Sequence, residues 1–335
     1  MQDFAPDFDP RRALSWLCSA SVVGPSGAVR SWHNPQHPGY DYPEAGGLLL
    51  SLLCDGAYAG APPAGTIADR IAGDLARTAD ADAIGRHGTR YLFDEAIVLA
   101  GLCRHARRRR GVEAGKLDAW LRRCIERVHA GVACEPPRPE RWSTLAGPHL
   151  LKLAITVGAW SDVDEAARDG LAALLHGASL RALDGRIATG VDHDGPTYLH
   201  AHCYAVEGAL RLAAGDLLAA APTRRARQLA MAGAAWLSRV QRPEGGLPAW
   251  HDGTHGHGVE PSDVAAQAIR IWALVDRAAF ASEIDRAWYF LSRCAAPSGA
   301  VRYHAGSADE NTWATIFAVQ AAHLARHGGS ATCLI

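Results

Sequence analysis

Three side chains that can hold or transfer a proton recur at helical spacing in the segment HAHCYAVEGAL, residues 200–210. His200, Tyr204 and Glu207 are separated by four and three residues, which places them on one face of a helix. Burial raises the pKa of a glutamate and suits it to general acid work, while histidine exchanges protons near neutral pH. We therefore predict that all three are catalytic and line a cavity. The alternative is a hydrogen-bonded network that only stabilises the core.

Two further carboxylates stand at the start of predicted helices. Glu44 lies in YPEAGG and Asp94 in FDEAIVLAGL. A carboxylate in the first helical turn also interacts favourably with the helix dipole, so capping alone accounts for either residue. Held on opposite sides of a cavity, the same pair suits glycoside hydrolysis, or proton abstraction in an epimerisation or elimination. We predict that both are catalytic.

Histidine- and tryptophan-containing loops supply candidate substrate contacts. The segment HDGTHGHG (251–258) is rich in His and Gly, and GVDHDGPT (190–197) similarly places His193 beside Asp194. Zinc sites normally show regular ligand spacing, which these loops lack. We therefore predict no metal and no cofactor, and place His251 at the rim of the cavity. Trp32 and Trp250 are predicted to stack against a sugar ring or to pack in the core.

The elements that must position these residues are almost all helical, because apolar residues recur near every 3.6 positions. Short glycine-containing segments separate several of the predicted helices: SGAVRSW (26–32), DGRIATG (184–190), EGGLPAW (244–250) and SGAVRYH (298–304). The last three recur at a spacing that fits one helical hairpin. We predict an all-α (α/α)6 toroid, one domain over residues 1–335, in which the first and last corners are neighbours. The proline-rich stretch 133–142 is predicted to be a long connection.

The composition of the chain limits the kinds of molecule that it is expected to bind. The chain has 335 residues, 48% of them hydrophobic, and a formal net charge of −1, so no global field attracts nucleic acid or anionic lipid. The basic run RHARRRR (104–110) is not interleaved with aromatic residues, and no apolar run reaches the length of a membrane span. The N-terminal segment lacks an apolar signal core. We expect a cytoplasmic protein without nucleic-acid partners or stable membrane insertion.

Several motifs, in order along the chain, resemble a family of bacterial (α/α)6 proteins associated with exopolysaccharide and lipopolysaccharide biosynthesis. Its members are described as six-hairpin-glycosidase-like or prenyltransferase-like. The motifs are YPEAGG, FDEAIVLAGL, HLLKLAI (149–155), HAHCYAVEGAL, DVAAQAIRIWAL (263–274) and GAVRYHAGSADENTWATIFAVQAA (299–322). The resemblance assigns the site to Tyr42, Glu44, Asp94, Lys152, His200, Tyr204, Glu207, Gln267 and Trp313. Ile316 stands where many relatives carry a lysine, so any chemistry that uses that lysine differs here.

Together these observations predict a carbohydrate-active enzyme, a hydrolase, epimerase or lyase, that uses acid–base chemistry on a sugar or oligosaccharide. Predicted substrate contacts are Trp32, Tyr42, Lys152, Trp250, His251, Asp263, Gln267 and Trp313. Two alternatives stay open. An isoprenoid cyclase or prenyltransferase-like toroid would need more than the 7% aromatic residues seen here to stabilise carbocations. A non-catalytic polysaccharide-assembly protein would have a filled cavity.

Overall fold

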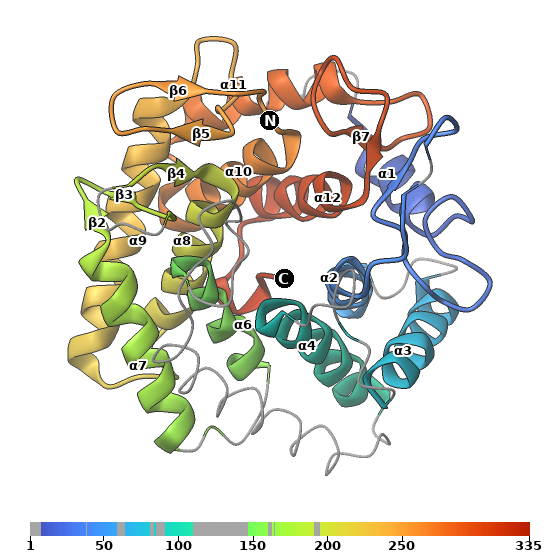
Figure 1. Ribbon diagram of the computed structural model, residues 1–335, viewed down its shortest axis with the longest axis horizontal. Coiled ribbons are helices and arrows are strands. Elements are labelled where there is room, and N and C mark those ends of the chain that lie inside the picture. The colour runs from blue at the N-terminus through green and yellow to red at the C-terminus, as the bar shows by residue number, and fades with distance from the viewer. Residues whose placement is uncertain are drawn as a thin grey trace.

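Among the described residues, helices alternate along the chain between the inside and the outside of a ring in the computed structural model (Figure 1). The structure describes residues 8–37, 39–58, 64–80, 84, 91–109, 147–159, 163, 165–190 and 195–335. The predicted connection 133–142, together with His193 and Asp194, lies outside these ranges. Viewed down the short axis, an inner set of helices surrounds the centre and an outer set covers it (Figure 1). The fold is the all-α (α/α)6 toroid that the helical patterning predicts.

The inner helices are apolar on nearly every face, because they pack against both the centre and the outer layer. They are α2 (Pro43–Cys54), α4 (Leu92–Arg109), η1 with α6 (Pro148–Lys152 and Leu153–Gly158), α8 (Leu199–Ala213), α10 (Ser262–Asp276) and α12 (Thr312–His327). In α2 every residue from Glu44 to Leu53 is buried. The six motifs that carry the family resemblance each include residues of the first turn of one of these helices.

The outer helices bury one face and expose the other, as amphipathic helices at a surface do. Those described are α1 (Pro10–Leu17), α3 (Ala64–Asp80), α7 (Glu165–Leu180), α9 (Ala220–Val240) and α11 (Ala281–Cys294). In α9, for instance, Ala226, Leu229, Ala230 and Trp236 are buried while Met231 is exposed. No described helix combines the length and the apolar composition that a bilayer crossing requires.

The repeated glycine segments are the corners at which the chain passes from an outer helix to the next inner one. The corner glycines Gly27, Gly185, Gly245 and Gly299 have φ between 87° and 103°, a region that favours glycine. Each also lies against an outer helix: a Cβ atom there would fall 2.1 Å from Arg70 O, 2.1 Å from Ala232 O, 1.8 Å from Arg286 O and 2.8 Å from Arg12 O, respectively. Each corner therefore docks on the next outer helix around the ring, and the last corner docks on the first helix.

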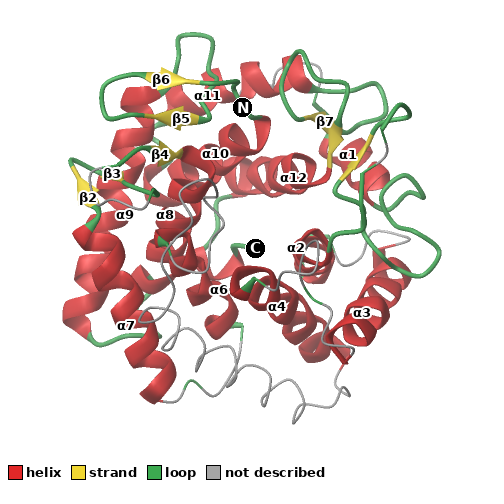
Figure 2. Ribbon diagram, viewed as in Figure 1, coloured by secondary structure: helices red, strands yellow, loops and turns green. Residues whose placement is uncertain are grey.

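Short strands in the connections between helices form three small sheets (Figure 2). They are β1 (Trp32–His33), β2 (Ala182–Leu183), β3 (Arg186–Ile187), β4 (Thr197–Tyr198), β5 (Trp250–His251), β6 (Gly256–His257), β7 (Val301–Arg302) and β8 (Glu310–Asn311). The strand β8 pairs antiparallel with both β1 and β7, with Asn311 opposite Trp32 and Val301. This confirms the prediction that the two SGAVR copies are neighbours, because the first and last hairpins meet in one sheet.

Candidate active site

Five inner helices, α2, α4, α8, α10 and α12, present their N-terminal turns toward one cavity of about 300 Å³. Glu44, His200, Asp263 and Trp313 are each the second residue of α2, α8, α10 and α12, and Asp94 is the third residue of α4. The described residues that line the cavity are Trp32, Tyr42, Glu44, Phe93, Asp94, Tyr198, His200, Asp263, Tyr303, Asp309, Asn311 and Trp313. The ring geometry thus brings together residues that are far apart in sequence.

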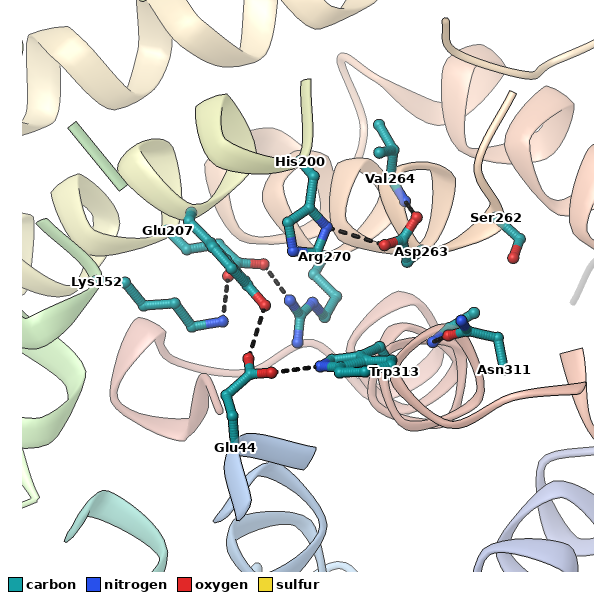
Figure 3. Close-up of polar contacts among 12 residues, drawn as sticks. Glu44, Lys152, His200, Glu207, Ser262, Asp263, Val264, Arg270, Asn311 and Trp313 are labelled. Atoms are coloured by element: carbon teal, nitrogen blue, oxygen red, sulfur yellow. Dashed lines mark hydrogen bonds and ion pairs between the residues drawn. The ribbon is translucent and has the colours of Figure 1, made fainter. Parts of the chain in front are cut away.

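Two of the lining carboxylates are held by ring donors. Trp313 donates its Nε1–H to Glu44 Oε2 at 2.6 Å, and Tyr204 donates its hydroxyl to Glu44 Oε1 at 3.3 Å (Figure 3). The hydroxyl of Tyr42 donates to Asp94 Oδ2 at 3.1 Å. Both carboxylates are buried and stand in a first helical turn, where the helix dipole favours negative charge. Their orientation is therefore fixed before any ligand binds.

A third carboxylate pairs with the histidine of the site. Oδ2 of Asp263 lies 2.9 Å from Nδ1 of His200, and its Oδ1 accepts the backbone N–H of Val264 at 2.8 Å (Figure 3). We assign the ring proton to Nδ1, because a carboxylate at that position stabilises it there. In the neutral ring Nε2 is then the proton acceptor, as in a base oriented by a carboxylate.

Aromatic side chains form much of the rest of the lining. The rings of Tyr42 and Trp313 lie 5.2 Å apart, and Tyr198 shares a hydrogen bond with Tyr303. Burial raises the pKa of Tyr198 well above its usual range and that of Tyr303 to about 12. Both phenols are therefore neutral at physiological pH and can donate hydrogen bonds to a ligand. Flat aromatic faces with a few polar groups are typical of small-molecule sites.

A fully buried charge cluster lies behind this cavity. Lys152 Nζ is 3.0 Å from Glu207 Oε2, and Arg270 donates to Glu207 Oε1 (Figure 3). Burial lowers the pKa of Lys152 to about 8, although Glu207 opposes this shift. The ammonium also lies 4.0 Å from the centre of the Tyr204 ring, whose hydroxyl contacts Glu44. The cluster thus contacts the cavity lining indirectly, through Tyr204 and its hydrogen bond to Glu44.

The structure brings together seven of the thirteen residues that the sequence assigns to the site. These are Trp32, Tyr42, Glu44, Asp94, His200, Asp263 and Trp313. Tyr204 and Glu207 were expected to line the cavity, but both are fully buried behind it. A helix rises 1.5 Å per residue, so these two side chains start about 6 Å and about 10 Å further along α8 than His200. Sharing a helix face therefore did not place them at the same depth.

The same reasoning applies to two other predicted contacts. Lys152 ends η1, and Gln267 lies one turn beyond Asp263 in α10; both are fully buried and outside the lining. Trp250 packs behind Tyr198, with ring centroids 4.8 Å apart, and His251 packs on Trp236 at 5.3 Å. In the described part of the chain, no group of three or more His, Cys, Asp or Glu side chains is placed to hold a metal ion.

Five lining residues were missed by the sequence reasoning. They are Phe93, Tyr198, Tyr303, Asp309 and Asn311. One signal was available, since Tyr198 and Asn311 directly precede α8 and α12, just as Tyr42 precedes α2. Tyr303 and Asp309 lie in the loop between β7 and β8, whose direction depends on strand pairing rather than on helical spacing.

No protein-family model and no curated protein sequence matches the chain. Several solved structures are similar to the chain in fold. A structure described as an unsaturated glucuronyl hydrolase specific for heparin superposes with a TM-score of 0.69 at 11% identity, over 94% of this chain and 95% of that one. A sugar epimerase from a ruminal bacterium gives 0.67 at 10% identity, over 94% and 98%. A glycosyl hydrolase family 88 protein from Bacteroides vulgatus gives 0.67 at 10%, over 93% and 97%. At such identities the likeness establishes the shared six-hairpin toroid.

Proposed function

We propose that this protein is a carbohydrate-active enzyme that transfers protons to and from a sugar bound in the cavity. The observation that carries this proposal is the convergence of Asp94, Glu44 and the His200–Asp263 pair on one aromatic-lined cavity. Proteins of the same fold also support the proposal, because their structures are described as a glucuronyl hydrolase, a sugar epimerase and a family 88 glycosyl hydrolase.

The polar residues of the site have different roles in this proposal. His200 accepts a proton at Nε2, while Asp263 stabilises the imidazolium that forms. The Asp94 carboxylate, positioned by the Tyr42 hydroxyl, faces the same cavity and is a second proton acceptor, while the His200 imidazolium returns a proton to the sugar. Glu44 is held by two donors and serves to orient the ligand. The aromatic rings supply stacking surfaces for the sugar ring.

Proton transfer of this kind underlies hydrolysis, epimerisation and elimination alike, and the products separate them. We would incubate the protein with a panel of mono- and oligosaccharides in D₂O and follow the mixture by NMR. Deuterium at a ring carbon identifies epimerisation, a new reducing end identifies hydrolysis, and a new alkene signal identifies elimination. The D94N and H200Q variants should lose about 10² to 10⁴ of the rate, as removal of a positioned acid or base does. Turnover that survives both substitutions contradicts the proposed roles.

The wider setting is proposed from the sequence. The helical patterning predicts a single domain over residues 1–335, the composition and the N-terminal segment predict a cytoplasmic location, and the family resemblance implies a place in polysaccharide biosynthesis. The same experiment tests the alternative of a non-catalytic polysaccharide-binding protein, for which sugars bind and no product forms.

The aromatic lining also fits an isoprenoid-handling toroid, in which rings stabilise a carbocation. A prenyl diphosphate carries several negative charges, whereas the described lining contains four carboxylates and neither Lys nor Arg. We therefore expect no turnover of prenyl diphosphates. Release of diphosphate from such a substrate would favour the isoprenoid alternative over the carbohydrate one.

A further inference from the structure

The charges that line the cavity are predominantly negative. Glu44, Asp94, Asp263 and Asp309 come from α2, α4, α10 and the β7–β8 loop, and among the described lining residues there is neither a lysine nor an arginine. His200 is the one side chain of that lining able to become positive. A small concave space with one sign of charge concentrates the field at the ligand.

The nearest buried cations do not offset this excess. Lys152 and Arg270 both bind Glu207, so the cluster behind the cavity retains about one positive charge against the four carboxylates in front of it. Neither side chain has exposed surface, and each lies over an aromatic ring: Lys152 over Tyr204 and Arg270 over Phe317. Neither cation therefore reaches a ligand in the cavity.

The aromatic side chains favour the same sign of ligand. Trp32, Tyr42, Tyr198, Tyr303 and Trp313 all contribute to the lining. The face of an aromatic ring carries partial negative charge and attracts a cation by about 0.5–2 kcal/mol, with tryptophan the strongest partner. Carboxylates and aromatic faces in one cavity are the combination that recognises an ammonium group.

We propose that the cavity selects an amino sugar, a sugar whose ring carries a protonated amine, and discriminates against a uronic acid of the same shape. This inference rests on the proposed carbohydrate function and names its substrate class. Asp309 is the carboxylate that we assign to ammonium recognition. Its side chain is 29% exposed at the rim, where Asn34 donates to it at 2.7 Å and His37 lies at 3.3 Å. The other three are buried, and each already has a partner within the site.

The test uses sugars that differ only in charge. Methyl glycosides of glucosamine, N-acetylglucosamine, glucose and glucuronic acid, with the matching galacto and manno series, would be titrated by calorimetry at low and high salt. We expect the amine to bind at least tenfold more tightly than the uronate, with the two neutral sugars between them. High salt should reduce the ratio, since screening weakens partly exposed charge interactions.

Two variants make the test specific to this cavity. D309N should reduce the preference for the amine over the neutral sugar several-fold, whereas D285N, which removes an exposed carboxylate of α11, should leave it unchanged. Equal or tighter binding of the uronate overturns the selection of amino sugars but leaves the carbohydrate function in place. Binding of none of these sugars contradicts the carbohydrate function itself. An unchanged preference in D309N removes Asp309 from the assignment.

Discussion

The ammonium of Lys152 lies 3.0 Å from the Glu207 carboxylate, and neither side chain has any exposed surface. Arg270 binds the other carboxylate oxygen and also donates to Gln320 Oε1 at 2.9 Å. One glutamate therefore pairs with two buried cations drawn from different inner helices, and the cluster keeps about one positive charge. The sequence predicted Glu207 as an acid–base residue, and these contacts favour a role in holding the ring together.

The E207Q substitution separates the two roles. Glutamine keeps the size of the side chain but leaves Lys152 and Arg270 without a counter-ion, and breaking a buried pair in this way costs about 3–5 kcal/mol. We expect a marked fall in the thermal midpoint measured by calorimetry. The double variant K152M/E207Q should recover part of that loss, because one of the two unpaired cations is gone. An unchanged midpoint with activity abolished would restore the catalytic assignment of Glu207.

The D263N substitution tests the His200 pair. An amide at position 263 no longer stabilises an imidazolium, so we expect kcat to fall by about 10² to 10⁴ while the fold persists. The pH profile of kcat should shift as well, a change that purely structural damage does not produce. D285N is the matched control, since Asp285 is exposed on an outer helix. Equal activity in both variants would exclude Asp263 from the mechanism.

The corner glycines predict a strong contrast between two glycine-to-alanine substitutions. At Gly245 the backbone has a φ of 90°, and the added Cβ would lie 1.8 Å from Arg286 O. The positive φ alone costs about 1–3 kcal/mol, and the clash adds to it. In α7 the added methyl of G177A meets nothing within 4 Å, and alanine favours a helix by up to about 1 kcal/mol. Denaturant unfolding should show G245A strongly destabilised and G177A unchanged or more stable.

Two buried histidines predict how stability depends on pH. Burial lowers the pKa values of His149 and His202 to about 3 each, from an unfolded value near 6.5. The unfolded chain therefore binds more protons than the folded one between pH 6.5 and pH 3. The free energy of unfolding should have its full value above pH 6.5 and should fall steadily as the pH drops through this window. H149N combined with H202N should flatten that slope, and a slope that persists would assign it to other groups.

The fold was predictable from sequence because its repeating unit is local. A 3.6-residue apolar period marks each inner helix, and the corner glycines recur where a close approach to a helix leaves no room for a side chain. The first-turn residues of the site were also predictable, since Glu44, Asp94 and His200 begin their helices. The depth of a side chain along its helix could not be predicted in this way. Tyr204 and Glu207 share a helix face with His200, yet both lie in the core.

The seam between the first and last hairpins bears on how the chain folds. Trp16 donates its indole N–H to Glu310 across 294 positions of sequence, and β1 has its described strand partner in β8. Contacts of such separation form slowly, because a long loop must close before they contribute any free energy. During synthesis β1 therefore cannot pair with β8 until the final hairpin has left the ribosome, and its edge stays unpaired until then. A ribosome stalled before residue 310 would hold an open arc of hairpins, which is a target for chaperones and for edge-to-edge aggregation.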